Sequence, residues 1–243
     1  MNSVLMLTRN NLDLTRRAVE SVLAQDIPIR LLVLDNDSTD GTRNWLGALF
    51  EHESRLQWVP FRPQLGVSAG WNWGLRQLFD YDRACRHVLV LNNDVVLPRW
   101  FYRTLLEHLQ GARGVPPVDF VTGVAIGEAV RNGPPVDAGA PLSPNPDFSA
   151  FLMGRRVWQA VGEFNEQMVH YASDCDYHVR AHRLGVPLWK ANVPYWHLGS
   201  GTMKRASEEE RAAIAAQANA DRAKFRAKYG CVPGEPEYAQ LFA

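Results

Sequence analysis

The first half of the chain alternates short apolar runs with segments whose apolar residues recur at helical spacing. The apolar runs predict strands at residues 4–7, 29–34, 56–60 and 87–91. The segments between them predict a helix that begins after Asn11, which can cap it, and further helices at residues 43–50 and 69–79. This alternation predicts a parallel sheet with right-handed crossovers. Polar residues follow each strand, so we expect the carboxyl ends of the four strands to converge on one crevice.

The second half of the chain is less regular. Residues 111–150 are rich in Gly and Pro, which indicates a long loop system around a strand at residues 120–126. A strand that turns into a short helix is expected at residues 151–164, a helix at 173–185 and a short strand at 187–191. Gly199, Ser200 and Gly201 have the flexibility of a hinge. A charged helix is expected at residues 207–229, followed by a loose tail.

Length and composition fit one large α/β domain, with 243 residues, 46% of them hydrophobic and 21% charged. The chain shows neither an apolar stretch of membrane-spanning length nor a charged-then-apolar leader, so we expect a cytoplasmic enzyme without integral membrane association. Lys+Arg and Asp+Glu are balanced at 26 each, which leaves no global field to attract nucleic acid. Cys85, Cys175 and Cys231 are odd in number and widely spaced, which argues against a disulfide framework or a structural zinc site.

The fourth apolar run ends abruptly in Asn92, Asn93 and Asp94. A carboxylate at the end of a buried strand, with amides beside it, suits a divalent cation that shares its other positions with phosphate oxygens. The alternative is a polar strand-to-turn junction, because Asn and Asp are also favoured in turns.

A dinucleotide-binding Rossmann domain would show the same alternation of strands and helices. Its glycine fingerprint should follow the first strand, yet residues 8–13 contain no glycine, and a Walker-type phosphate loop is absent from the sequence. A nucleotide bound in this crevice must therefore be held by side chains and a metal.

Seven short motifs together resemble the family 2 glycosyltransferases with the GT-A fold, over about residues 2–203. They lie at residues 8–10, 35–42, 65–74, 91–94 and 161–166, at Asp174 to Asp176 with Arg180, and at His197. The resemblance implies a single Rossmann-like α/β domain at residues 1–206, with a mostly parallel central sheet flanked by helices. Residues 1–110 would form its nucleotide-sugar half and residues 111–206 its acceptor half, followed by a C-terminal helix and tail at 207–243.

The resemblance also implies which residues bind the donor, expected to be a UDP- or GDP-sugar. Asp35, with Asp37 nearby, would accept a hydrogen from the edge of the nucleotide base. The alternative for this loop is a helix N-terminal cap. Thr8 and Asn72 match positions on the ribose or base side, although Asn72 can also be a solvated helix residue.

Two further parts of the resemblance concern the metal and the reaction. Asp94 matches the last residue of the metal-binding acidic motif, Asn92 replaces its first Asp and can act through water, and Asn93 lies between them. His197 would complete the shell of Mn²⁺ or Mg²⁺. Asp174 matches the general base of inverting members, with Asp176 as the alternative. Both carboxylates also suit the first turn of a helix, whose dipole they would stabilise.

We therefore expect an inverting, metal-dependent glycosyltransferase that moves a hexose from a nucleotide diphosphate sugar to an acceptor hydroxyl. The acceptor can be a glycan, a small molecule, a protein or a hydroxymethylated nucleic-acid base, and nucleic acid is expected only in that role. Two alternatives remain open: a sugar nucleotidyltransferase, and a non-catalytic sugar- or nucleotide-binding module of the same fold.

Overall fold

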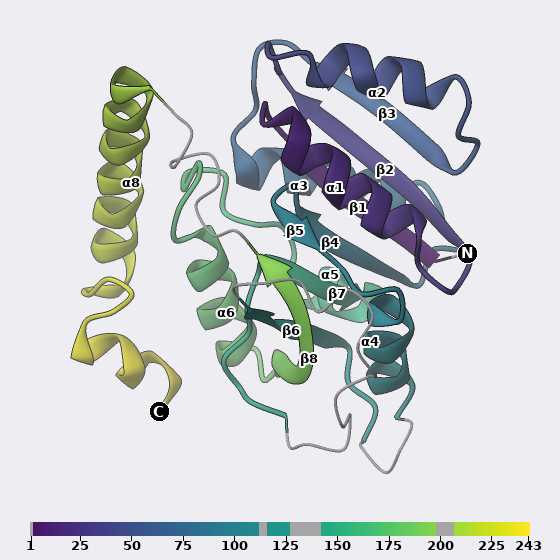
Figure 1. The fold of residues 1–243 in the computed structure, drawn as a ribbon. Helices are drawn as coiled ribbons and strands as arrows, with labels where there is room; N and C mark the ends of the chain where they lie inside the picture. Colours follow the sequence, from purple (N-terminus) through teal and green to yellow (C-terminus); the bar gives the residue numbers. More distant parts are fainter. Residues whose placement is uncertain (1, 112–115, 127–141, 198–206) are drawn as a thin grey trace.

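A computed structural model describes residues 2–111, 116–126, 142–197 and 207–243 of the chain. Its centre is an eight-stranded sheet in the order β3-β2-β1-β4-β7-β6-β8-β5, with helices packed on both faces (Figure 1). The expected hinge at Gly199, Ser200 and Gly201 lies outside the described residues.

The first half of the chain forms the predicted alternation of strands and helices. Its elements are β1 (Asn2–Thr8), α1 (Leu12–Leu23), β2 (Ile29–Asn36), α2 (Thr42–Phe50), β3 (Leu56–Phe61), α3 (Val67–Leu75), a π-helical turn (Arg76–Asp80) and β4 (His87–Asn92). β1 pairs in parallel with β2 and β4, and β2 pairs in parallel with β3. Asn11 is at the N-cap of α1 as predicted, but its backbone is left-handed and its side chain makes no capping hydrogen bond.

The second half makes the sheet mixed. Its elements are β5 (Val95–Val96), α4 (Phe101–Gln110), β6 (Phe120–Ile126), β7 (Ala150–Gly154), α5 (Arg155–Val161), α6 (Ser173–Arg183), β8 (Trp189–His197), α8 (Glu208–Tyr229) and a 3-10 helix (Pro236–Phe242). β7 runs antiparallel to β4 and β6, β5 antiparallel to β8, and β6 parallel to β8.

For the second half, the bounds of one predicted strand were wrong, and so was the expectation of a loose tail. The strand predicted at residues 187–191 is β8, which runs on to His197, so this histidine ends a strand. The tail is not loose: Tyr238, Leu241 and Phe242 of the 3-10 helix pack on a small apolar cluster with buried Phe225. Apolar side chains three or four residues apart place this helix against the protein instead of in solvent.

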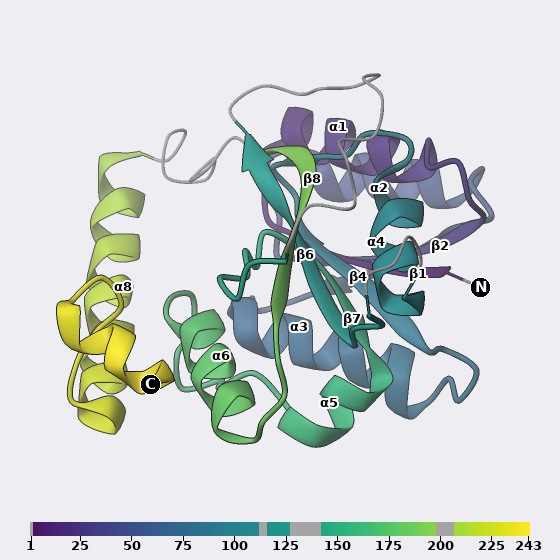
Figure 2. The ribbon, with the colours of Figure 1, turned by 90° about the horizontal axis from the view of Figure 1, so that it is seen from below.

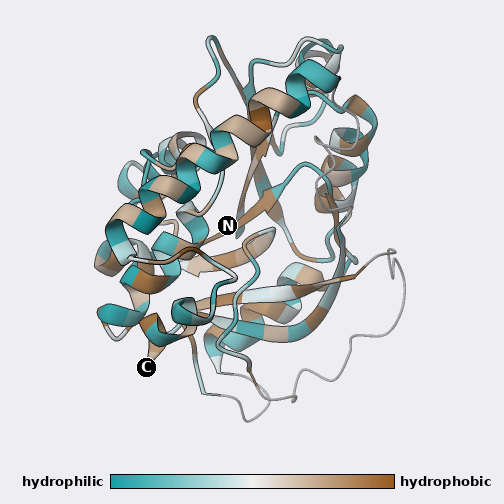
Figure 3. Ribbon diagram, turned by 90° about the vertical axis from the view of Figure 1, so that its left-hand side faces the viewer, coloured by the Kyte–Doolittle hydropathy of each residue, from teal (hydrophilic) through white to brown (hydrophobic). Residues whose placement is uncertain are grey.

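Alternate side chains of β1 to β4 and of β7 enter two separate cores, as the pleat of a β-strand requires. Val4 and Met6 of β1 pack with residues of α1, α2 and α4 on one face, whereas Leu5 and Leu7 pack with residues of α3, α5 and α6 on the other. Figure 2 shows these two sets of helices on opposite sides of the sheet. In Figure 3 hydrophobic stretches occur on the strands and on the helices, and α8 carries many hydrophilic residues. Among the described residues, no helix is both long and apolar enough to cross a membrane.

Gly123 lies at an irregularity in β6 that sets the register of β8. The pairing of these strands shifts between Thr122 and Val124, after which β8 continues to His197. A Cβ atom at Gly123 would lie 2.5 Å from the carbonyl oxygen of Val193 and 2.8 Å from the ring of Phe101. Both neighbours are packed in the core, so neither can retreat easily.

We therefore expect Gly123→Ala to lower the free energy of unfolding by about 2 kcal/mol, within the range for overpacked cores. Denaturant unfolding with an unchanged m-value would measure it. A loss below about 0.5 kcal/mol, the scale of ordinary surface substitutions, would contradict the close approach of β6 and β8.

Candidate active site

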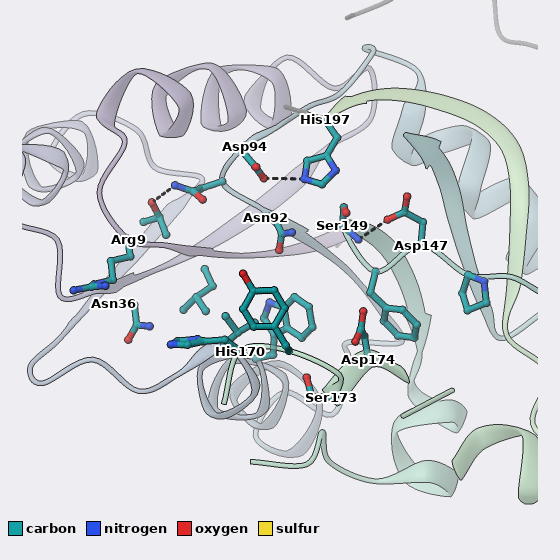
Figure 4. Close-up of a pocket in the computed structure, with 18 of the residues that line it drawn as sticks. Arg9, Asn36, Asn92, Asp94, Asp147, Ser149, His170, Ser173, Asp174 and His197 are labelled. Carbon is teal, nitrogen blue, oxygen red and sulfur yellow. Dashed lines mark hydrogen bonds and ion pairs between the residues drawn. The ribbon is translucent and has the colours of Figure 1, made fainter. Parts of the chain in front are cut away.

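A cavity of about 670 Å³ opens where the carboxyl ends of the central strands meet. Thr8 and Arg9 reach it from the end of β1, Asn36 from β2, and Asn92 from β4 (Figure 4). Its other walls come from the segments before β7 and α6, from the start of α6, and from α3, β8 and α8. They include residues 145–149, His170, Tyr171, Ser173, Asp174, Val67, Trp71, Lys190, His197 and Ile214. The predicted crevice at the strand ends is therefore present.

Asp94 and His197 meet at one side of this cavity. Asp94 lies in the turn between β4 and β5, and β5 pairs with the end of β8, with Val95 opposite His197. This pairing leaves Oδ1 of Asp94 3.2 Å from Nε2 of His197. Carboxylate and imidazole are suitable ligands for Mn²⁺, and the carboxylate also for Mg²⁺. No group of three or more His, Cys, Asp or Glu side chains that could hold a metal occurs in the described part of the chain.

Asp174 stands on the opposite side of the cavity from Asp94 and His197 (Figure 4). It occupies the first turn of α6, and its Oδ1 accepts a hydrogen bond of 2.9 Å from the backbone N–H of Cys175. Burial raises the pKa of Asp174 above its ordinary value, and this hydrogen bond offsets only part of that effect. A carboxylate with a raised pKa is a stronger base, which is the property that proton abstraction requires.

Asp176 does not line the cavity, although it is only two residues from Asp174. Its buried carboxylate accepts hydrogen bonds from Arg180 (2.7 Å), Lys228 (2.5 Å) and the hydroxyl of Tyr229 (2.9 Å). Burial alone would raise the pKa of Asp176, but the bonds from Lys228 and Arg180 outweigh it and hold the pKa below the usual range. The side chain ties α6 to α8.

Asp35 and Asp37 also lie outside the cavity lining. The fully buried carboxylate of Asp35 accepts hydrogen bonds from the N–H of Ser38 (2.9 Å) and from Nε of Arg43 (2.7 Å). Asp37 is 3.9 Å from the guanidinium of Arg43. Asn36, between them, faces the cavity instead (Figure 4), because successive side chains of a strand point to opposite sides.

Thr8 and Asn93 both line the cavity, and they contact each other. Nδ2 of Asn93 lies 3.0 Å from Oγ1 of Thr8. Asn72 is neither at the cavity nor solvated: its fully buried amide bonds to both the N–H and the carbonyl of Phe164, each at 2.8 Å. It therefore joins α3 to the segment that leads towards α6.

Comparison with known sequences identifies the family. The sequence profile described as Glycosyl transferase family 2 matches residues 3–124, which includes β1 to β4 and Asp94. The chain belongs to this family. No curated protein matches the sequence of this glycosyltransferase.

Solved structures of other glycosyltransferases share its GT-A fold. The mannosyltransferase PcManGT from Pyrobaculum calidifontis, in complex with GDP-Man and Mn²⁺, has 19% identity and a TM-score of 0.62 over 98% of this chain and 67% of that one. TarS 1-349 from S. aureus, in complex with UDP, has 15% identity and a TM-score of 0.62 over 100% and 70% of the two chains. GalNAc-T7 with UDP, GalNAc and Mn²⁺ has 10% identity and a TM-score of 0.64 over 81% and 43%. At these identities the likeness concerns the fold alone.

Several cavity residues of this glycosyltransferase were missed by the sequence analysis. Arg9 and Asn36 directly follow the predicted Thr8 and Asp35, so the strand-end position was the available signal. His170, Tyr171 and Lys190 belong to no motif. Burial lowers the pKa of His170 below its ordinary value, which favours the neutral imidazole.

Proposed function

We propose that this glycosyltransferase moves a hexose from a nucleotide diphosphate sugar to an acceptor hydroxyl with inversion, with the help of Mn²⁺ or Mg²⁺. The observation that carries this proposal is the arrangement of the cavity. Asp94 and His197 stand together on one side and Asp174, with its raised pKa, on the other (Figure 4). Direct displacement at the anomeric carbon needs a stabilised leaving group and a base on opposite sides of the sugar, which this arrangement supplies.

Asp94 and His197 would hold the cation through Oδ1 and Nε2, which already lie 3.2 Å apart. A bound divalent cation neutralises the negative charge that develops on a departing nucleoside diphosphate. The carboxamide of Asn92, which also lines the cavity, would bind a water of the cation or a phosphate oxygen. These three residues would therefore orient the leaving group.

Asp174 would remove the proton of the acceptor hydroxyl as that oxygen attacks the anomeric carbon. Asp176 is less suited to this role, because its oxygens are bound by Arg180, Lys228 and Tyr229. The segment with His170 and Tyr171, directly before α6, would form the wall against which the acceptor lies.

The nucleoside would lie at the end of the cavity lined by Arg9 and Asn36, which is far from Asp174 in Figure 4. This placement puts the diphosphate between the nucleoside and the sugar, beside Asp94. Oδ1 of Asn36 accepts a 2.7 Å hydrogen bond from the N–H of Leu65, so its NH₂ group can donate to a carbonyl oxygen of uracil or guanine. The UDP and GDP-Man in the similar structures support a UDP- or GDP-sugar as donor.

Hydrolysis of a panel of nucleotide sugars in the presence of Mn²⁺ tests the proposal. We expect one UDP- or GDP-sugar to release free sugar and nucleoside diphosphate slowly, with water in place of the acceptor, and EDTA to stop the reaction. A nucleotidyltransferase would instead join a sugar phosphate to a nucleoside triphosphate. Binding of a nucleotide sugar without turnover would favour a non-catalytic module.

We expect Asn36→Ala to weaken the binding of the preferred nucleoside diphosphate, because one hydrogen bond to the base is lost. A loss of about 1 kcal/mol, typical of a single hydrogen bond, corresponds to roughly fivefold in Kd. Calorimetry with UDP or GDP and Mn²⁺ measures it, with the exposed Glu51→Gln at the end of α2 as a control. An unchanged Kd would place the nucleoside elsewhere.

A further inference from the structure

The C-terminal part of the chain packs beside the helix that carries Asp174. α8 and the 3-10 helix lie next to α6 in both Figure 1 and Figure 2. Their apolar side chains share a cluster with Met168, Ala172 and Val179, which belong to α6 and to the segment before it. This C-terminal unit lies outside residues 3–124, which the family profile matches.

Asp221 of α8 is the centre of this contact. Its carboxylate is fully buried and accepts hydrogen bonds from three successive backbone N–H groups, those of Val169 (3.1 Å), His170 (2.9 Å) and Tyr171 (3.0 Å). The amide of Gln217 donates a fourth, of 2.8 Å. Burial opposes ionisation, but the N–H groups outweigh it and hold the pKa of Asp221 below its usual range. Hydrogen bonds to an ionised acceptor are the strong ones.

The same segment is held from its other side by the start of α3. Oγ of Ser68 donates a 2.6 Å hydrogen bond to the carbonyl of Met168, and the N–H of Val67 donates a 2.8 Å bond to the carbonyl of Val169. The backbone at residues 168–171 is therefore fixed between α3 and α8. Removal of either set of bonds would leave it held from one side only.

This segment leads directly into the part of the cavity wall that contains Asp174. His170 and Tyr171 line the cavity, and Asp174 comes three residues later. Between them Ala172 has a left-handed backbone with φ of 61°, a conformation that costs free energy for a residue with a Cβ atom and persists only where surrounding contacts hold it. The bonds to Asp221 lie directly before this turn.

We propose that Asp221 is a positioning residue, which fixes the backbone of residues 169–171 and thereby places both the acceptor wall and Asp174. The proposal rests on the proposed role of Asp174 as the base. The same C-terminal unit also holds the first turn of α6 after Asp174: Lys228 and Tyr229 donate hydrogen bonds to Asp176, and Tyr238 packs against the same apolar cluster as Cys175. Asp174 thus lies between two segments that the C-terminal unit holds, residues 169–171 before it and Asp176 after it.

The test is Asp221→Asn, which keeps the size of the side chain but replaces one acceptor oxygen with an NH₂ group. Hydrogen exchange should become at least about tenfold faster in peptides covering residues 168–174, because backbone N–H bonds are lost. With the nucleotide sugar that the wild type hydrolyses, kcat should fall about tenfold, because a small misplacement of a catalytic group costs rate. The donor KM and the Kd for nucleoside diphosphate with Mn²⁺ should stay within about twofold, because Asp94 and Asn36 lie on other elements.

Two controls separate positioning from general loss of stability. Leu46→Val in α2 opens a small gap in the opposite core, far from α8, and should lower the melting temperature while leaving kcat unchanged. Arg222→Gln changes the exposed neighbour of Asp221 and should alter neither exchange nor kcat.

Faster exchange with an unchanged kcat would overturn the proposal, and so would a donor Kd that rises as kcat falls. If the wild type neither binds nucleoside diphosphate nor hydrolyses any nucleotide sugar, the proposed function fails by itself. The exchange measurement then decides the role of Asp221. Unchanged hydrogen exchange at residues 168–174 in Asp221→Asn would overturn that role.

Discussion

Asp94→Ala should remove the metal-dependent binding of nucleoside diphosphate and lower turnover by at least about a hundredfold, because a bound cation contributes several kcal/mol to charge stabilisation. Asp94 supplies the carboxylate oxygen that lies 3.2 Å from Nε2 of His197. Without that oxygen the imidazole would lose its partner in holding the cation. Calorimetry with UDP or GDP, with and without Mn²⁺, measures the loss on wild type and variant.

The comparison needs a variant that keeps the shape of the side chain. Asp94→Asn retains the size and one oxygen but removes the charge, so it should show an intermediate Mn²⁺ affinity if the carboxylate is a ligand. Exposed Glu51→Gln removes a carboxylate from another part of the surface and should leave binding unchanged. Equal Mn²⁺-dependent binding of nucleoside diphosphate by wild type and Asp94→Ala would show that Asp94 does not hold the metal.

The elements of the first half could be predicted from the sequence because their signals are local. Apolar runs such as residues 87–91 are bounded by polar residues, and the helices between them have regular spacing. The antiparallel place of β7 beside β4 could not be predicted, since it depends on pairing between residues far apart in the sequence. The same holds for the 3-10 helix, whose partners Met168 and Val179 lie far from it in the sequence.

The residues of the candidate site also differ in whether the local sequence could predict their position. Asp94 and Asn93 follow a strand whose end could be located, and both line the cavity. Asp35 and Asp176 carry the expected chemistry, but each is bound by a partner that the local sequence does not identify, Arg43 in one case and Lys228 in the other. A motif thus indicates which side chains are present, and the packing around it decides which of them face the cavity.

Asp174→Asn should lower kcat by at least about a hundredfold, the usual scale for the loss of a general base. The amide keeps the shape of the carboxylate but cannot accept a proton. Donor KM and the Kd for nucleoside diphosphate should barely change, because Asp174 stands across the cavity from Asp94 (Figure 4). Transfer or donor hydrolysis at saturating donor measures kcat.

The pH dependence gives a second, independent measurement. A general base acts when it is deprotonated, so activity should be lost as pH falls through the pKa of Asp174. Because burial raises that pKa above the ordinary value, the acid limb of the wild-type profile should lie at higher pH than for an exposed aspartate. Asp174→Asn should lack this limb in whatever activity remains.

Asp176→Asn distinguishes the two carboxylates of α6. Asp176 has a lowered pKa because its bonds from Lys228 and Arg180 outweigh the effect of burial. Its ionised carboxylate therefore stabilises the fold above the ordinary pKa of aspartate, and this stabilisation is lost as the pH falls through the lowered pKa. The variant should therefore unfold more easily near neutral pH, with the difference from wild type shrinking in acid, while the acid limb of its activity stays in place. If instead Asp176→Asn shifts that limb and Asp174→Asn retains near-normal kcat, the base is Asp176, and the packed carboxylate must leave Lys228 to reach the substrate.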